Sequence, residues 1–215
     1  MRKMFLTIVI ILPLFSSAQI GLKAGLNFAN VTNASSINSS SRSGFLAGIF
    51  LAPPSKGILS SRTELIFSRQ GYNFKNGANT GNVNLDYILL PQLMSINITK
   101  YFSIQLGAQM AFLINAKADS STSTGGSGSN PYGKIMDFYN KFDYGFAGGI
   151  EIHPYKGLLI GARFNISLGN LYKMPSATDS TYTAPPSFIP KVDVKNNVFQ
   201  IFTGWTFGNK SSKKK

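Results

Sequence analysis

The sequence contains no cysteine, and only one histidine and one tryptophan among its 215 residues. Without cysteine there is no disulfide, no thiolate nucleophile and no cysteine-ligated zinc site. His153 is the single imidazole, so a metal site has no second histidine and a Ser-His-acid relay has no other base. We therefore predict no catalytic residues, no metal and no cofactor.

Charge and long apolar runs are also scarce. Charged residues make up 13% of the chain, whereas soluble domains carry roughly 25%. Beyond the N-terminus, no apolar run approaches the roughly 18 residues of a membrane helix. The charge that is present is basic, with 21 Lys and Arg against 8 Asp and Glu. No basic stretch is interleaved with stacking aromatics, so we expect no nucleic-acid partner.

The N-terminus has the pattern of a secretory signal. Arg2 and Lys3 precede an apolar stretch over residues 4–15, and Ser16, Ser17 and Ala18 supply small residues for a cleavage site. The apolar stretch is too short for a membrane anchor and contains a proline. We predict a signal peptide over residues 1–18 and a mature chain that begins at Gln19.

The mature chain shows period-two alternation, and helical spacing is nowhere sustained. In residues 102–115, apolar side chains from Phe102 to Ile114 alternate with small or polar ones. Such alternation, bounded by Gly, Pro, Asn and Ser clusters, predicts strands. We expect eight of them, at about residues 20–29, 44–52, 59–72, 83–96, 102–115, 142–153, 158–169 and 197–207.

The connections between these segments alternate in length. Long segments at 30–42, 73–82, 117–139 and 173–196 alternate with short ones at 53–57, 97–101 and 154–157. Outer-membrane barrels have short periplasmic turns and long outer loops. We therefore predict an all-β fold, an eight-stranded antiparallel up-and-down transmembrane β-barrel over residues 19–208. A solvated basic tail follows at residues 209–215.

Side-chain size decides which face meets lipid. The narrow interior of an eight-stranded barrel cannot hold the Phe, Leu, Ile and Tyr of the apolar faces, so these should point outward. The opposite faces carry the charges, and unpaired buried charges are costly. We predict an interior ion-pair network of five residues: Arg62, Glu64, Asp86, Glu151 and Arg163. Lys23 and Asp143 share this parity, and we place them at the solvated rims.

Aromatic residues gather near the strand ends, as in the girdles of outer-membrane barrels. We expect a periplasmic girdle at Tyr101, Phe102, Tyr155, Trp205 and Phe207. An outer girdle is expected at Phe28, Phe67, Tyr72, Phe112, Phe142 and Tyr172.

Several stretches resemble the PorT-like outer-membrane β-barrel domain proteins. The matching segments are 21–27 (GLKAGLN), 64–72 (ELIFSRQGY), 85–91 (LDYILLP), 145–151 (GFAGGIE) and the closing WTF at 205–207. The resemblance covers the mature chain and implies an outer-membrane barrel. The name-giving member of the family is linked to protein secretion, and the resemblance does not imply that role for this chain.

We predict a non-enzymatic barrel of the bacterial outer membrane with a structural or surface-interaction role and no open pore. Its expected partners are outer-membrane lipid and lipopolysaccharide, the barrel insertion machinery and an extracellular ligand or protein, and the barrel is expected to be a monomer. The alternatives are a secreted lipocalin-like ligand-binding barrel and an outer-membrane lipid-modifying enzyme. Residues 128–134 imitate a phosphate-binding loop, but Ile135 stands where Ser or Thr must bind magnesium.

Overall fold

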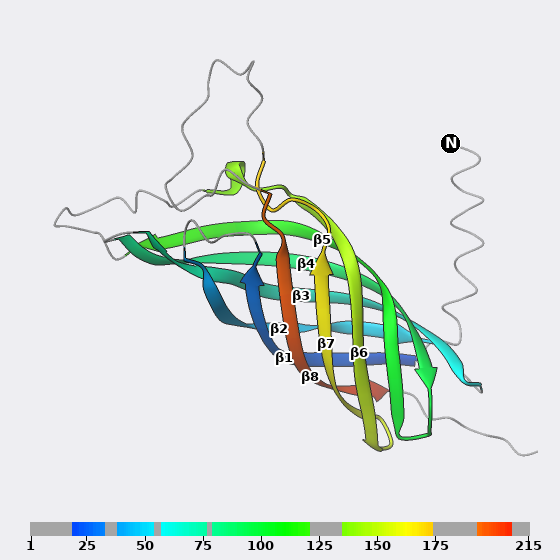
Figure 1. The fold of residues 1–215 in the computed structure, drawn as a ribbon. Helices are drawn as coiled ribbons and strands as arrows, with labels where there is room; N and C mark the ends of the chain where they lie inside the picture. The colour runs from blue at the N-terminus through cyan, green and yellow to red at the C-terminus, as the bar shows by residue number, and fades with distance from the viewer. Residues whose placement is uncertain are drawn as a thin grey trace, which may run out of the picture.

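The computed structural model describes residues 19–32, 38–53, 57–76, 79–120, 135–173 and 193–207. They form one closed barrel in which each strand pairs antiparallel with the next and β8 closes on β1 (Figure 1). The strands are β1 (Gln19–Val31), β2 (Ser40–Ala52), β3 (Leu59–Asn76), β4 (Asn79–Asn97), β5 (Phe102–Ser120), β6 (Phe142–Tyr155), β7 (Leu158–Ser167) and β8 (Asn196–Phe207). The predicted all-β, eight-stranded antiparallel fold is confirmed.

A single 3-10 turn, η2 (Met136–Phe138), is the one helical element within these ranges. None of the described residues forms a helix that is long and apolar enough to cross a membrane. The predicted signal peptide at 1–18, the tail at 209–215 and the loop-like motif at 128–134 lie outside the described residues.

Short connections gather at one end of the barrel, where β6 meets β7 through residues 156–157. Gly157 has φ +85°, which favours glycine, and a Cβ at this position would lie 3.1 Å from the Thr206 carbonyl oxygen and from the Trp205 ring. Short turns face the periplasm in outer-membrane barrels, so we call this end periplasmic and the opposite end outer.

One predicted long loop is paired strand instead. Residues 73–82 were expected as a connection, but the β3–β4 ladder continues to the pair Asn76 and Asn79. Likewise β5 continues to Ser120, and these three strands reach beyond their neighbours at the outer end (Figure 1). Asn, Gly and Lys are poor strand formers, so composition hid the alternation around Phe74 and Val83. The strict alternation of long and short connections is therefore wrong at this position.

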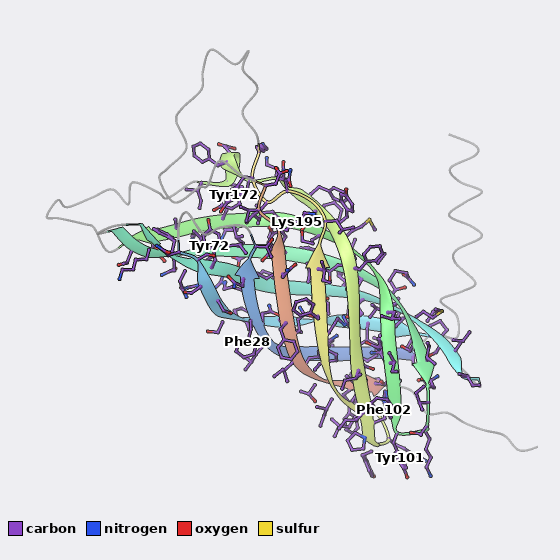
Figure 2. The ribbon with its side chains drawn as sticks, viewed as in Figure 1. Phe28, Tyr72, Tyr101, Phe102, Tyr172 and Lys195 are labelled. Atoms are coloured by element: carbon purple, nitrogen blue, oxygen red, sulfur yellow. The ribbon has the colours of Figure 1, made fainter. Side chains whose placement is uncertain are left out.

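The outer surface of the barrel is apolar over most of its height. Every strand contributes outward side chains, and Phe28 is one that can be followed in Figure 2. The half-exposed apolar residues include Leu22, Leu26, Phe45, Ile49, Leu65, Met94, Leu106, Met110, Phe146, Ile150, Ile160, Phe164, Phe199 and Ile201. We call this zone the apolar belt; its orientation agrees with the sequence-based prediction of a lipid-facing surface.

Above the apolar belt, the outward side chains of β3, β4 and β5 become polar, and their inward side chains are apolar and buried. In β3 and β4 the same parity faces inward throughout, so the reversal there is one of residue type. The outward set is Arg69, Asn73, Lys75, Asn82, Asn84, Asp86, Asn115, Lys117 and Asp119; the inward set is Tyr72, Phe74, Val83, Leu85, Tyr87, Leu113, Ala116 and Ala118. We call this part the outer extension. Its faces are those of a sheet in water.

A β-bulge in β5 takes part in the reversal. Leu113 pairs with Tyr87 and Asn115 pairs with Asp86, so Ile114 is the extra residue. A bulge inserts one residue into one strand and shifts the faces beyond it. Odd-numbered residues of β5 therefore face inward up to Leu113, and even-numbered residues face inward from Ala116.

The inward apolar residues of the outer extension form a plug across the outer end. Ile135, Tyr139, Leu171, Tyr172 and Val194 from the connections pack onto it, and all five are buried. Tyr72 and Tyr172, labelled in Figure 2, were predicted for the outer girdle but belong to this plug. Tyr72 lies at an inward position of β3, and Tyr172 lies in the connection after β7 and is bridged to Tyr139. The predicted outer girdle is wrong at these two residues.

Candidate functional site

The most buried charged cluster lies in the periplasmic half of the barrel interior and is centred on Glu64. Lys23 Nζ lies 3.1 Å from Glu64 Oε2, and the two guanidinium nitrogens of Arg163 donate to both Glu64 oxygens at 2.7 and 2.9 Å. The Arg163 contact is a bidentate, charge-assisted pair. Three strands that are distant in sequence, β1, β3 and β7, thus meet at one carboxylate.

A second carboxylate extends this cluster toward the periplasm. Arg62 Nη1 lies 2.5 Å from Glu151 Oε1 and 3.8 Å from Glu64 Oε1. Aromatic rings cover the cations, with Lys23 Nζ 3.4 Å from the Phe202 ring centre and the Arg62 guanidinium 4.7 Å from that of Phe50. Such contacts add attraction where water is excluded.

The structure brings together four of the five residues predicted for the interior network: Arg62, Glu64, Glu151 and Arg163. Asp86 does not join them. It faces outward in the outer extension, where Arg69 Nε lies 2.7 Å from Asp86 Oδ1 and Asn115 donates to its other oxygen. The prediction for Asp86 is wrong because the reversal of faces above the apolar belt puts polar residues outside.

Two members of the cluster are missing from the predicted set. Lys23, expected at a rim, is 3% exposed and bound to Glu64. Gln105 accepts a hydrogen bond from Arg163 Nη2 at 2.8 Å and donates to Ser95 at 3.2 Å. Both residues lie at inward-facing positions of their strands. The period-two alternation of the sequence marks these positions and could have identified both residues.

A glycine on β6 makes room for the cluster. A Cβ at Gly149 would lie 2.3 Å from the Ala162 carbonyl and 3.1 Å from Arg163 Cβ. Any side chain there would have to move the Arg163 backbone. Gly149 therefore allows β6 to approach β7 closely enough for Arg163 to reach Glu64.

An amide layer occupies the interior on the outer side of the charged cluster. Asn27 donates to Ser68 at 2.8 Å and accepts from Gln200 at 3.0 Å. Gln70 donates to Ser68 at 2.9 Å and accepts from Asn196 at 2.6 Å. These side chains satisfy one another in place of water.

Three tyrosine hydroxyls meet in the plug at the outer end. Tyr72 lies 2.8 Å from Tyr139 and 2.7 Å from Tyr172, oxygen to oxygen. Tyr139 and Tyr172 also form a β-bridge, and Asn140 donates to the Tyr172 carbonyl at 3.1 Å. Burial raises the pKa of Tyr139 and of Tyr172 above the ordinary tyrosine value. The trio ties two connections to β3.

The periplasmic end is open and holds the single histidine. His153 Nε2 lies 3.5 Å from Ser103 Oγ and 3.8 Å from Glu151 Oε2. A nucleophilic relay needs the serine on one ring nitrogen and the acid on the other. Here the same nitrogen faces both groups, so this Ser-His-Glu arrangement is not a relay. Within the described ranges, no three His, Cys, Asp or Glu side chains gather as metal ligands would.

Apolar belt, polar interior and closed eight-stranded sheet together define a small barrel of the bacterial outer membrane. The chain belongs to the outer membrane protein beta-barrel domain family, whose model matches residues 13–173. That match covers the described strands from β1 to β7. No curated protein matches the sequence.

Solved structures are similar to this chain at low sequence identity. Neisserial surface protein A is 16% identical with a TM-score of 0.51, over 87% of this chain and 97% of that one. Ail, the attachment invasion locus protein of Yersinia pestis, is 13% identical with a TM-score of 0.47, over 89% and 99%. OprG from Pseudomonas aeruginosa is 13% identical with a TM-score of 0.42, over 90% and 97%.

Proposed function

We propose that the protein is a non-enzymatic barrel without an open pore, whose outer extension contacts lipopolysaccharide and a ligand outside the cell. The single observation that carries this proposal is the reversal of faces in β3, β4 and β5. A sheet whose outward face is polar does not lie in the hydrocarbon of the membrane. We therefore infer that this part of the barrel serves contacts outside the membrane.

The absence of a pore is inferred from what fills the interior. The charged cluster, the amide layer and the tyrosine plug follow one another along the barrel axis, each bonded across several strands. An eight-stranded barrel has room for little beyond its own side chains. We expect purified full-length protein in planar bilayers to show no stepwise conductance, and reproducible single-channel steps would contradict this part.

Basic residues on the outer extension and beside it support lipopolysaccharide as a partner. Arg42 of β2 is held against the outer extension, with Nε 2.9 Å from the Asn84 side-chain oxygen and Nη1 3.1 Å from that of Asn73. Lys75 and Lys117 are exposed on the same outward face. Cations next to an apolar belt are placed to meet lipid phosphates.

A pair of matched variants tests the lipid contact. Lys75→Gln with Lys117→Gln should reduce the thermal stabilisation that lipopolysaccharide-containing vesicles give relative to phosphatidylcholine vesicles. Lys100→Gln with Lys156→Gln removes the same charge at the periplasmic end and should leave this stabilisation unchanged. Equal effects of the two double variants would contradict a specific contact at the outer extension.

The two alternatives from the sequence are less well supported. A lipocalin-like barrel carries its apolar side chains inside, whereas this barrel carries them outside. A lipid-modifying enzyme needs reactive groups near the outer leaflet, but the single histidine lies at the periplasmic end and both interior glutamates are bound to cations. The PorT-like subfamily, the monomeric state and contact with the insertion machinery stay predictions.

A further inference from the structure

The periplasmic end contains a large open vestibule with a one-sided charge. Its volume is about 1180 Å³, and Arg62, Lys100, His153 and Lys156 are among its lining residues. None of the described residues that line it is Asp or Glu. Hydroxyl groups of Ser60, Ser95, Thr99 and Ser103 complete the polar lining. The vestibule therefore presents cations and hydrogen-bond donors but no carboxylate.

The charged cluster behind the vestibule has more cations than carboxylates. Lys23, Arg62 and Arg163 face Glu64 and Glu151, so three basic side chains face two acidic ones. The acidic residues that the sequence suggested as further partners lie elsewhere: Asp86 is on the outer extension, and Asp143 is bonded to Ser167 and the Gly169 amide. A surplus charge in a low-dielectric interior is costly unless an anion compensates it.

Arg62 connects the cluster to the vestibule. Its side chain is 9% exposed and lines the cavity. Its Nη1 is engaged by Glu151, and its Nε is buried. An arginine in the wall of a cavity is a charge-assisted hydrogen-bond donor for an oxyanion.

The rim of the vestibule adds two lysines. Lys100 and Lys156 are exposed on two different turns, and Lys100 Nζ lies 4.7 Å from the centre of the Tyr101 ring. Ser103 and His153 also line the vestibule, with Ser103 Oγ 3.5 Å from His153 Nε2. Tetrahedral oxyanions are bound in proteins by this combination of arginine, lysine and hydroxyl groups.

We propose that the periplasmic vestibule binds an oxyanion, namely the phosphate group of a periplasmic solute, with Arg62 at its floor and Lys100 and Lys156 at its rim. The site goes beyond the proposed function, since it lies at the opposite end from the outer extension. The bound phosphate compensates the surplus positive charge of the interior cluster.

The test is a ³¹P NMR titration of inorganic phosphate with full-length protein in octyl glucoside, which contributes no phosphorus signal. We expect saturable broadening of the phosphate line at constant ionic strength. Lys100→Gln with Lys156→Gln should weaken binding at least about tenfold, as expected for lost charge-assisted contacts. Lys141→Gln with Lys173→Gln, two exposed lysines outside the vestibule, is the matched control and should bind as the parent does.

Two further arms address the ligand and the charge argument. Acetate should compete weakly with phosphate; equal competition would replace phosphate by carboxylate as the ligand and overturn this assignment. Lys23→Met removes the surplus charge without touching the vestibule, and it should weaken phosphate binding severalfold. Heat-modifiable migration on gels reports that each variant is folded.

The proposal would be overturned if the broadening of the phosphate line did not saturate as phosphate is added. It would also be overturned if the control double variant lost as much binding as Lys100→Gln with Lys156→Gln. Unchanged phosphate binding in both Lys23→Met and Lys100→Gln with Lys156→Gln would overturn it as well.

Discussion

The apolar belt and the outer extension are built from the same strands with opposite faces. In the belt, β3 points Leu65 outward and Glu64 inward; in the extension, it points Arg69 outward and Tyr72 inward. The backbone pairing is continuous across both regions. The comparison teaches that the surrounding solvent selects residue types for each face, while the hydrogen-bond ladder is indifferent to them.

The two regions also differ in how much stability is lost when their interiors are changed by substitution. The belt encloses ion pairs with almost no exposure, and the extension encloses apolar groups and three hydroxyls. On their outer faces, the belt meets hydrocarbon and the extension meets water. Substitutions of the same kind should therefore have very different effects at the two heights.

Arg163→Leu should have the largest effect. It removes both bonds to Glu64 and the bond to Gln105 from the belt interior. Breaking a buried ion pair costs about 3 to 5 kcal/mol of unfolding free energy. The urea midpoint of the heat-modifiable band measures this. Lys117→Leu on the exposed outer extension is the control, and equal midpoints for the two variants and the parent would show that the cluster is solvated.

Ile150→Arg places a charge on the lipid face of the belt. We expect failed insertion or a loss of about 2 to 4 kcal/mol near the bilayer midplane. Asn82→Arg makes the same change on the outward face of the outer extension and should stay within about 0.5 kcal/mol. Folding yield in lipid vesicles compares them. If Asn82→Arg were as harmful as Ile150→Arg, the outer extension would lie in lipid as well.

Tyr72→Phe tests the interior of the outer extension. It removes the hydroxyl shared by Tyr139 and Tyr172 and leaves both with one partner fewer. We expect a loss of about 1 to 3 kcal/mol, the cost of unsatisfied buried polar groups. Urea unfolding measures it, with Tyr101→Phe at the exposed periplasmic turn as the control. A Tyr72→Phe variant as stable as the parent would mean that the trio does not hold the plug.

Alkaline pH provides a second test of the plug. Because burial raises the pKa of Tyr139 and Tyr172, the folded chain keeps protons that the unfolded chain releases above its ordinary value of about 10. Stability from these groups is complete below pH 10 and should fall by about 1.4 kcal/mol per pH unit above it for each buried tyrosine. Urea midpoints between pH 9 and 11 measure the slope. Urea midpoints that do not change between pH 9 and 11 would mean that both hydroxyls are in contact with water.

Asp86→Asn should have the smallest effect. The Arg69 side chain is 43% exposed and the Asp86 side chain 6%, so water screens the ion pair from the Arg69 side. Surface ion pairs contribute about 0 to 1 kcal/mol. Glu64→Gln in the buried cluster is the comparison and should destabilise several times more. Comparable urea midpoints for the two variants would remove the distinction between the two regions.

Much of the barrel could be predicted from the sequence, and most errors fall at the outer end. The eight strands and their lipid-facing sides follow from period-two alternation of large apolar residues. The prediction went wrong at Lys23, which lies in the interior cluster and not at a rim, at Tyr172 in a connection, and at residues 73–82, Tyr72 and Asp86 in the outer extension. There the rule that polar residues face inward no longer applies, because the strands have left the membrane.

The sequence by itself determined the strand order, the parity of each strand and the side chains that face lipid, because these depend on neighbours two residues apart. Only the tertiary structure decided which charges meet. Glu64 receives Lys23 from β1 and Arg163 from β7 because the sheet closes into a barrel, and closure brings together residues 41 and 99 positions apart. The bulge at Ile114 likewise became visible only in the pairing of β4 with β5. Alternation along one strand contains no information about the register of another.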